Sequence, residues 1–374
     1  MHIYLDNAAT TKPCLSAVNA VTNALTDIYG NPSSLHVLGV EAQKIIENSR
    51  KVIAHALGCD RETLYFTSGA TESNNIALRG IANTYGRRKK RIVTTTVEHA
   101  SVRETLDYLE QNGFETVRIP PPFSTESFLN AIDDNTCLVS MMYVNNETGH
   151  ILPAEKVFTA VKRRCPEIIT HCDCVQAFMK LPVKCNKLNA DLISISSHKI
   201  YGVKGCGALY IRNGVRIAPI MTGGKQEKGI RSGTEAVPLI AGFGAAVSEL
   251  LPNTDKNYRH ATALKEQLLN GLNRINGITV NSTEDCSPYI VNISIDKIRS
   301  EIMLHFLEKQ GVYVSSGSAC SKGALSGVLE EFGVSRKNAD CALRISFSSE
   351  TITEDIETLV NAIDNGLKSL IKQR

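Results

Sequence analysis

The amino-acid sequence predicts an α/β protein with a mostly parallel central sheet and a second, smaller α+β domain. Short apolar runs alternate with amphipathic segments through about the first 250 residues, and the pattern changes after the break Leu251-Pro252-Asn253. Short buried strands separated by helices are typical of βαβ units, whose strands are parallel. We therefore expect a large domain over residues 15–250 and a small domain built from residues 1–14 and 251–374.

The large domain begins with a clear helical pattern. Apolar residues form one stripe between Val40 and Leu57, and Gly58 is expected to end this helix. Strands and helices then alternate. Strands are expected at residues 64–67, 92–95, 138–144, 168–172, 192–195 and 208–211, and helices at 71–85 and 101–112.

The small domain has longer periodic segments. Helices are expected at residues 260–273, 300–310 and 353–373, with an alternating strand at 289–295. A large helical share beside a few strands is typical of an α+β arrangement.

Composition excludes several function classes. The 374 residues are 43% hydrophobic and 21% charged, and the net charge is only +3, so no nucleic-acid or membrane partner is indicated. The one dense basic run, residues 87–91, favours a solvated turn over a nucleic-acid patch. No segment approaches the roughly 18–20 apolar residues of a membrane span, and the N-terminus lacks an export signal. Eleven scattered cysteines then predict reduced thiols and a cytoplasmic location.

Lys199 is the most informative residue. It follows the strand predicted at 192–195 and stands among the small polar residues Ser196, Ser197 and His198. A lysine that is desolvated at a strand end becomes neutral more easily and can form a Schiff base. Its immediate neighbours equally fit a surface lysine in a hairpin loop.

A candidate phosphate site precedes it in the chain. Gly69, Ala70 and Thr71 follow a predicted strand and open a helix. Glycine permits close backbone approach, and a helix N-terminus offers N–H groups and a positive dipole end to an anion. The same pattern also fits an ordinary capped helix start.

Further polar groups end neighbouring strands. Asp173 follows the strand at 168–172, where α/β sheets bind ligands, and His99 follows the strand at 92–95. His99 alone fits a helix cap, and Asn145 fits an ordinary turn. A metal site built from residues 171, 172 and 174 is disfavoured because side chains alternate along a strand. Together the lysine, acid, histidine and phosphate cradle meet the requirements of pyridoxal 5'-phosphate.

A second reactive centre is expected in the small domain. Cys320 lies in the small-residue segment Ser315–Gly323, beside Lys322, where a thiolate nucleophile is favoured. An inert loop cysteine is the alternative. Arg344 lies in a strand-like segment and suits either a carboxylate clamp or a structural ion pair.

These residues together resemble the cysteine desulfurases of the NifS/IscS type, pyridoxal-phosphate enzymes of fold type I in the class-V aminotransferase family. The matching motifs span nearly the whole chain in order. They are Tyr4–Thr11, Gly30–Ser34, Thr67–Ser73, Glu98–His99, Val144–Glu147, Asp173 with Gln176, Ser196–Gly202, Arg231–Thr234 and Ser315–Cys320. One departure stands out: Lys225 occupies a position where the family usually has glycine, which puts the conformation of that loop in doubt.

The resemblance implies a role for each matched residue. Lys199 would hold the cofactor covalently, Asp173 would bind the pyridine nitrogen, Gln176 the ring hydroxyl, and His99 would stack on the ring and transfer protons. The remaining roles concern the phosphate and the substrate. The phosphate would be bound by Gly69, Ala70, Thr71, Ser196 and His198, with Thr234 reaching the partner subunit's phosphate in a homodimer; the substrate carboxylate would be bound by Asn145 and Arg344.

The resemblance also implies the reaction. L-cysteine would yield L-alanine, and its sulfur would pass to Cys320 as a persulfide for delivery to a sulfur-acceptor protein. A selenocysteine lyase and an aminotransferase of the same fold are alternatives, although transamination needs no thiol. A catalytically silent scaffold is the third alternative, and it conflicts with the presence of Lys199, Asp173, His99 and Cys320.

Overall fold

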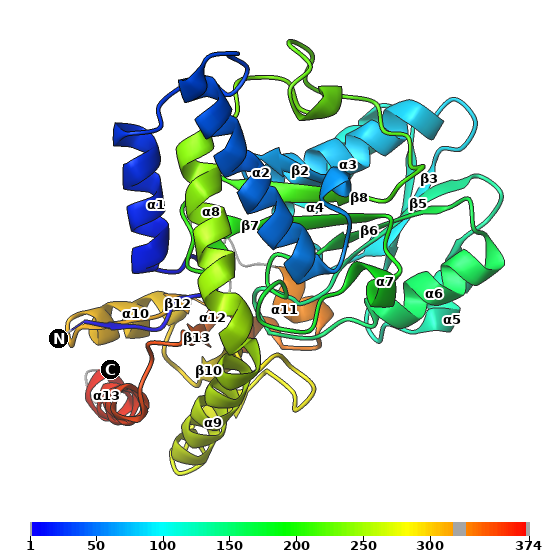
Figure 1. Ribbon diagram of the computed structural model, residues 1–374. Helices are drawn as coiled ribbons and strands as arrows, with labels where there is room; N and C mark the ends of the chain where they lie inside the picture. Colours follow the sequence, from blue (N-terminus) through cyan, green and yellow to red (C-terminus); the bar gives the residue numbers. More distant parts are fainter. Residues whose placement is uncertain (1, 317–326, 372–374) are drawn as a thin grey trace. The chain divides into compact units, whose positions relative to one another are not determined.

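The computed structural model describes residues 2–316 and 327–371 (Figure 1). Contacts group the chain into two compact units. The large unit comprises Lys12–Tyr143 and Leu152–Asn253, and the small unit comprises Met1–Thr11, Val144–Ile151 and Thr254–Arg374. The segment Val144–Ile151 groups with the small unit, whereas the sequence-based boundaries placed it in the large domain. As a division into folding domains, those boundaries remain a prediction.

The large unit is built on a mostly parallel sheet, as predicted. Its seven strands, counted over the described residues, lie in the order β2-β8-β7-β6-β5-β3-β4. Only β8 runs antiparallel to its neighbours. The strands are β2 (Leu64–Thr67), β3 (Arg91–Thr95), β4 (Glu115–Ile119), β5 (Thr136–Met142), β6 (Ile169–Asp173), β7 (Leu192–Ser196) and β8 (Gly207–Ile211).

The register brings the polar strand ends together. Asp173, the last residue of β6, pairs with Met142 of β5 on one side and with Ser194 of β7 on the other. Because parallel strands end at the same edge, the residues that follow β5, β6 and β7 emerge side by side. Lys199 follows β7 at this edge, in the turn of the β7–β8 hairpin.

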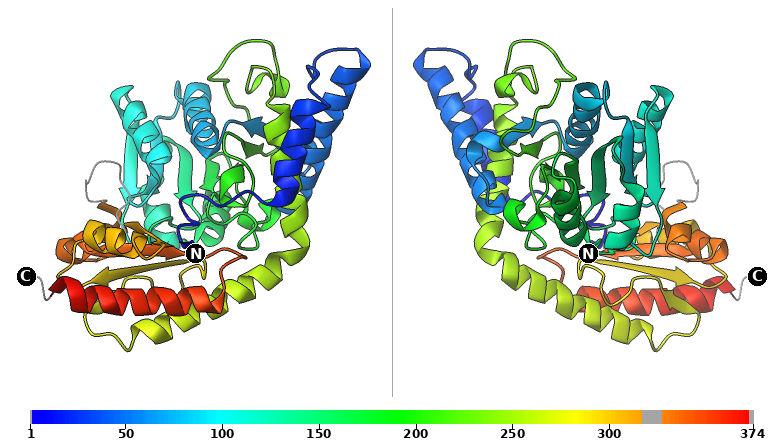
Figure 2. Two further views of the ribbon diagram at one scale, coloured as in Figure 1. Left: turned by 90° about the vertical axis from the view of Figure 1, so that its left-hand side faces the viewer. Right: turned by 90° about the vertical axis from the view of Figure 1, so that its right-hand side faces the viewer.

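Helices cover both faces of the sheet. In Figure 2, α1 (Leu15–Thr26), α2 (Val37–Leu57) and α8 (Val237–Leu250) lie on one side. On the opposite side, α3 (Ala70–Tyr85) and α4 (Ala100–Gln111) pack against each other, and apolar residues such as Ile76, Ile81 and Leu106 meet the sheet there. The unit also contains α5 (Thr125–Ala131), α6 (Ala154–Arg164) and α7 (Cys185–Leu188).

Helix α2 illustrates how the sequence determines an element. Its buried stripe includes Ala42, Ile46 and Ile53, as the periodicity predicts. Gly58 ends the helix with φ 69°, a left-handed conformation that glycine adopts without steric cost. The helix begins three residues before the predicted start, at Val37, because the imidazole Nδ1 of His36 accepts a hydrogen bond from the N–H of Gly39.

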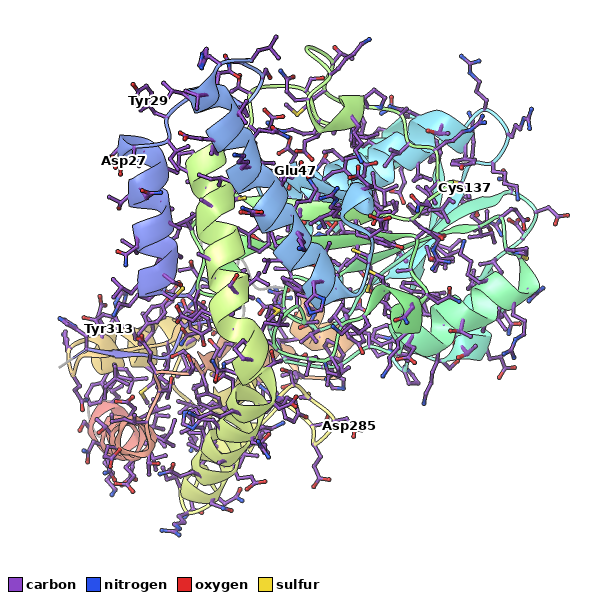
Figure 3. The ribbon with its side chains drawn as sticks, in the orientation of Figure 1. Asp27, Tyr29, Glu47, Cys137, Asp285 and Tyr313 are labelled. Atoms are coloured by element: carbon purple, nitrogen blue, oxygen red, sulfur yellow. The ribbon has the colours of Figure 1, made fainter. Side chains whose placement is uncertain are left out.

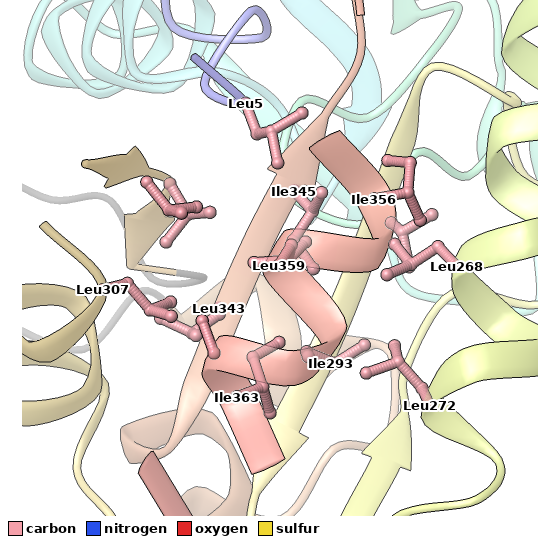
Figure 4. Packing of buried hydrophobic residues seen from close by; sticks show 14 of the residues in the cluster. Leu5, Leu268, Leu272, Ile293, Leu307, Leu343, Ile345, Ile356, Leu359 and Ile363 are labelled. Atoms are coloured by element: carbon pink, nitrogen blue, oxygen red, sulfur yellow. The ribbon is translucent and has the colours of Figure 1, made fainter. Parts of the chain in front are cut away.

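In its described residues, the small unit contains an antiparallel sheet and two helices of 19 residues each, α9 and α13. The sheet order is β12-β13-β10-β9, and a separate pair joins β1 to β11. In Figure 4, Leu359 and Ile363 of α13 and Leu268 of α9 meet Ile293 of β10 and Leu343 of β13. The elements are β1 (Ile3–Tyr4), α9 (Thr254–Leu272), β9 (Ile278–Val280), β10 (Ile290–Ile295), α10 (Ser300–Glu308), β11 (Val312–Tyr313), β12 (Ser315–Ser316), α11 (Gly327–Glu331), α12 (Arg336–Asp340), β13 (Ala342–Ser346) and α13 (Thr353–Ile371).

Within the residues described, no helix is both long and apolar enough to cross a membrane.

Candidate active site

Helix α3 begins with a glycine in a special conformation. Gly69 has φ 150°, and a Cβ built on it would meet no atom within 4 Å. The helix therefore opens toward unfilled space with its first N–H groups and its positive dipole end, as a phosphate site requires. Ala70 is half-buried and Thr71 is exposed at the same helix start.

The start of α3 is tied to a distant loop. The carboxylate of Glu72 accepts hydrogen bonds from the N–H of Ser68 and, at 3.0 Å, from Nε of Arg231. Burial alone would raise the pKa of Glu72, but these hydrogen bonds and the arginine charge lower it. The ion pair thus holds the Arg231–Thr234 segment beside the helix. Thr234 itself is exposed.

A buried ion pair fixes the loop that precedes Arg231. Both guanidinium Nη atoms of Arg50 contact the carboxylate of Glu227, at 2.9 and 2.8 Å. The same carboxylate accepts the N–H of Phe66 in β2 at 2.8 Å, so the loop is joined directly to the sheet. Glu47, labelled on α2 in Figure 3, adds a second contact to Arg50 at 3.4 Å.

Lys225 lies in that loop. The sequence left the loop conformation in doubt because the family usually has glycine at this position. Its φ is 65°, and Glu227 and Lys228 also have positive φ. Glycine adopts this conformation at less cost than lysine. The loop keeps a glycine-like backbone here although the residue is lysine.

Asp173 is held in one orientation at the end of β6. Its Oδ2 accepts a hydrogen bond from the Asn74 amide at 2.8 Å, and its Oδ1 accepts the N–H of Val175 at 3.0 Å. Asn74 is fully buried and also donates to the hydroxyl of Ser101 at 2.8 Å. Asp173 is 6% exposed, and its carboxylate is held by Asn74 of α3 and by its own turn.

His99 lies at the N-cap of α4, so the helix-capping interpretation is correct. Its Nδ1 accepts the N–H of Ser101 at 3.1 Å, which orients the ring. The ring keeps an exposed face, but surrounding protein partly desolvates it. This burial lowers the pKa of His99; Lys199 and Arg103 lower it further, whereas Asp173 raises it. The ring is therefore close enough to respond to the charges of both Asp173 and Lys199.

Glu98, next to His99, is a buried carboxyl group. Its Oε1 accepts the Thr95 hydroxyl at 2.7 Å and the N–H of Met142 at 2.9 Å, and the side chain joins β3 to β5. Burial raises its pKa to about 8. At neutral pH the group is mostly protonated.

Lys199 stands in a short 3₁₀ turn, Ser197–Lys199, directly after β7. Ser196 and Ser197 are buried, whereas His198 and Lys199 are half-buried. Burial lowers the pKa of His198 to about 4, helped by the charges of Lys199, Lys204 and Lys180. Several cations around one half-buried edge make it suited to a multiply charged anion.

Gln176 follows Asp173 by one turn and is 5% exposed. Its Oε1 accepts a hydrogen bond from Nζ of Lys180 at 3.1 Å. Lys180 is itself 7% exposed, and its contact directs the carbonyl side of the Gln176 amide toward a cation.

A cavity of about 520 Å³ joins two of the predicted site residues. Its lining includes Thr71 at the start of α3 and His99 at the start of α4, together with Asn75, Arg79 and Tyr108. Asp173 and Lys199 are not among its lining residues.

The predicted substrate-binding residues lie in the small unit. Arg344, in β13, donates from Nη2 to Asp6 at 2.8 Å and from Nη1 to the carbonyl of Asn146 at 2.9 Å. It is 3% exposed, and its buried Nε contacts no partner in the described part of the chain. The side-chain oxygen of Asn145 accepts the N–H groups of Glu147 and Thr148, both at 3.0 Å, in its own turn.

Cys320 lies outside the described residues, so its predicted role stays a prediction. Its segment follows β12, which ends at Ser316 and pairs with β13. Residue Ser315 of β12 lies opposite Arg344.

Sequence reasoning missed several residues that shape this site. Asn74 holds Asp173, and the pair Arg50–Glu227 holds the loop before Arg231. Asn74 lies one turn inside α3 on its buried side, and a polar residue there is a local signal. The Arg50–Glu227 pair joins residues far apart in the sequence and left no such signal.

The buried residues near Asp173 include His171 and Cys172. His171 bridges the hydroxyls of Ser140 and Ser194, at 2.8 and 3.0 Å, and burial lowers its pKa to about 4. Over the described ranges no group of three or more His, Cys, Asp or Glu side chains is arranged to hold a metal ion.

Comparison with known proteins decides the family. The model of the class-V aminotransferase family matches residues 3–359. The cysteine desulfurase IscS of Methanosarcina thermophila is 37% identical over 98% of this chain and 92% of its own length. The chain belongs to the cysteine desulfurases of the class-V aminotransferase family. A solved structure titled NifS-like protein superposes with a TM-score of 0.94, at 35% identity over 98% of this chain and all of the other.

A second solved structure is also similar to this chain. The structure titled SspA in complex with cysteine is 30% identical over 94% of this chain and all of the other, with a TM-score of 0.83. The resemblance of the sequence to the NifS/IscS type is confirmed, and with it the predicted fold class and enzyme class.

Proposed function

We propose that this desulfurase converts L-cysteine to L-alanine with pyridoxal 5'-phosphate and retains the sulfur on Cys320. One observation carries the proposal: His99, Asp173 and Lys199 stand at the carboxyl ends of β3, β6 and β7, strands that run parallel in the large sheet. An aspartate, a histidine and a lysine at one edge are the groups that such chemistry needs.

The residues present fit the cofactor. The N-terminus of α3 opens toward unfilled space at Gly69, as a phosphate requires. Asn74 Oδ1 and Ser197 Oγ are buried without a partner in the part of the chain described, so polar atoms remain available beside Asp173 and Lys199. In this proposal the phosphate is held by Gly69, Ala70, Thr71, Ser196 and His198, the ring by Asp173, Gln176 and His99, and the covalent bond is made by Lys199.

When bound, the cofactor supplies an electron sink that acidifies the α-hydrogen of the substrate. Once the amino group of the substrate has displaced Nζ of Lys199, the free amine would remove that proton, and His99, whose pKa is lowered, would transfer protons as a neutral imidazole. Asn74 and the N–H of Val175 hold both oxygens of Asp173, and this fixed carboxylate would bind the ring nitrogen of the cofactor.

The sulfur step belongs to the small unit. The Cys320 thiolate attacks the sulfur of the substrate; a sulfur–sulfur bond forms, the carbon–sulfur bond breaks, and its electron pair remains with the carbon skeleton that leaves as alanine. Arg344 and Asn145 bind the substrate carboxylate. Nε of Arg344 is buried and has no partner among residues 2–316 and 327–371, which supports this assignment because one donor of the guanidinium remains for a ligand.

The proposal extends to partners. Thr234 is exposed beside the Arg231–Glu72 pair, and we assign it to the phosphate of a second subunit in a homodimer. The persulfide passes to a sulfur-acceptor protein by thiol attack. We place this activity in the cytoplasm, whose reducing conditions suit a persulfide chemistry.

The test measures alanine and sulfide released from L-cysteine with a reductant, for the wild type and for Cys320→Ala. Alanine release that depends on Cys320, with Cys165→Ala unaffected as the matched cysteine control, supports the proposal. An unchanged alanine rate in Cys320→Ala contradicts the persulfide step. Conversion of a keto acid by an amino donor, in place of sulfide release, identifies an aminotransferase instead.

A further inference from the structure

Two cysteines of the large unit lie together outside the site described above. Cys59 follows the end of α2, and Cys185 is the first residue of α7. Their neighbours along the chain are in contact, since the side chain of Lys184 lies against Gly58. Both cysteines line one cavity of about 390 Å³, together with Thr63, Tyr210 and Arg212.

The backbone holds this pair in place. The N–H of Cys59 donates to the carbonyl of Ala54 at 3.0 Å, in the turn that Gly58 forms at the end of α2. Lys184, one residue before Cys185, donates from Nζ to the carbonyl of Ala56 at 2.8 Å. Its side chain also lies against Gly58. Two independent contacts therefore keep the start of α7 against the end of α2.

The two thiols differ in exposure. Cys59 is half-buried at the cavity wall, whereas Cys185 is only 4% exposed. Both side chains line the cavity, and Cys59 is the more exposed of the two. This order matches the attacking and resolving thiols of a reactive pair.

Their acidities differ in the same sense. The hydrogen bond from Cys185, together with one involving Thr63, lowers the pKa of the Cys59 thiol against the opposing effect of burial. The hydrogen bond with Cys59 and burial raise the pKa of Cys185. The thiol of Cys59 is therefore the more acidic of the two.

We propose that Cys59 and Cys185 form a dithiol that reacts with hydroperoxides and closes to a disulfide between α2 and α7. The Cys59 thiolate attacks the outer peroxide oxygen, the O–O bond breaks, and the hydroperoxide leaves as an alcohol or water after protonation. The Cys185 thiol then attacks the sulfur of the Cys59 sulfenic acid; the sulfur–oxygen bond breaks, and the proton of the thiol leaves with the hydroxyl group as water. Two electrons pass from the sulfur pair to the peroxide.

The disulfide would join residues 59 and 185 across a long stretch of the large unit. Cross-links that close long loops restrict the unfolded chain most. We therefore expect the oxidised form to resist unfolding better than the reduced form. The site lies at the C-terminal end of α2 and is independent of the sulfur transfer assigned to Cys320.

The experiment treats reduced, cofactor-loaded Cys320→Ala protein with graded hydrogen peroxide, blocks remaining thiols, and maps peptides by mass spectrometry. Removing Cys320 ensures that the proposed active-site thiol contributes no signal. The expected result is a peptide pair joined through Cys59 and Cys185, formed at least about ten times faster than oxidation of the half-buried Cys165. Cys59→Ser and Cys185→Ser in the same background should abolish it, and Cys165→Ser should not.

A second measurement keeps the proposal testable if Cys185→Ser folds poorly. The peroxide-treated protein should melt several degrees above its reduced form, and the difference should disappear in Cys59→Ser. Oxidation of Cys59 to a sulfinic acid without a joined peptide, or equal reactivity of Cys59 and Cys165, would overturn the proposal. Neither outcome affects the alanine assay that tests the desulfurase reaction.

Discussion

Asn74 donates a hydrogen bond from Nδ2 to Oδ2 of Asp173 at 2.8 Å, and both side chains are buried. The contact joins the first turns of α3, whose start opens toward unfilled space, to the end of β6. Asn74 also donates to Ser101 of α4, so this one amide contacts both the Asp173 carboxylate and the neighbouring helix. The start of α3 and the carboxylate at the end of β6 are therefore fixed relative to each other within that unit.

Asn74→Ala should weaken catalysis without unfolding the protein. A hydrogen bond to a charged group contributes about 1.5–3 kcal/mol, which corresponds to a loss of roughly 10- to 100-fold in kcat/KM. The check is alanine release together with the visible absorption of the bound cofactor. The control Asn112→Ala, at the exposed end of α4, should leave both unchanged. Wild-type kcat/KM in Asn74→Ala would show that Asp173 needs no such support.

Glu98 should make stability depend on pH. Its carboxyl pKa is raised to about 8 in the folded protein, far above the roughly 4.3 of an unfolded chain. As the pH rises, the carboxyl group loses its proton at a lower pH in the unfolded chain than in the folded protein. The free energy of unfolding therefore falls as the pH rises from about 4.3 through 8. The glutamine of Glu98→Gln stays neutral, so its melting temperature should fall less than that of the wild type between pH 5 and 8.5. If the melting temperatures of the two proteins fell equally between pH 5 and 8.5, the raised pKa of Glu98 would be contradicted.

Much of the fold could be predicted because apolar periodicity is local. Strand β2 appears at the predicted residues, and α2 to β8 follow the expected alternation within one to three residues at most ends. The unpredicted helix α8 contains Gly242 and Gly244, which lower helix propensity although tertiary packing keeps them helical. The edge strand β4 is mostly half-exposed and lacks an apolar run. The site residues predicted in the large unit share one sheet edge because topology, rather than spacing, brings strand ends together.

The buried pair of Arg50 and Glu227 should be important for stability. Removing one partner leaves the other charge buried without compensation, and Glu227→Ala should therefore lower the free energy of unfolding by about 3–5 kcal/mol. Chemical denaturation measures this loss. The matched control is Glu62→Ala, which breaks the exposed pair with Lys228 and should change stability little because solvent screens that pair. Equal effects of the two substitutions would mean that the buried pair is not essential.

Arg344→Lys should separate substrate binding from turnover. The two Nη atoms of Arg344 contact Asp6 and the carbonyl of Asn146, and Nε has no partner among the described residues, so it remains for a carboxylate. The single ammonium group of lysine cannot make all three contacts. We expect the KM for L-cysteine to rise at least about tenfold with a smaller change in kcat. Steady-state alanine release measures both. Arg299→Lys, in an exposed pair with Asp340, should behave as the wild type. A fall in kcat at constant KM would instead assign Arg344 to positioning alone.

His99 should set the acid limit of catalysis. Burial and the neighbouring charges of Lys199 and Arg103 lower its pKa, so the imidazole becomes protonated only below the ordinary value of about 6.5. If the neutral ring transfers protons, kcat/KM should stay constant as the pH falls from 8 to 6.5 and should decline at lower pH. His99→Gln should reduce kcat/KM by roughly 10²- to 10⁴-fold and remove that decline, since proton transfer by a positioned group contributes this much. The exposed His55→Gln should preserve the wild-type profile. A decline that begins above pH 6.5, or that persists in His99→Gln, would assign the acid limit to another group.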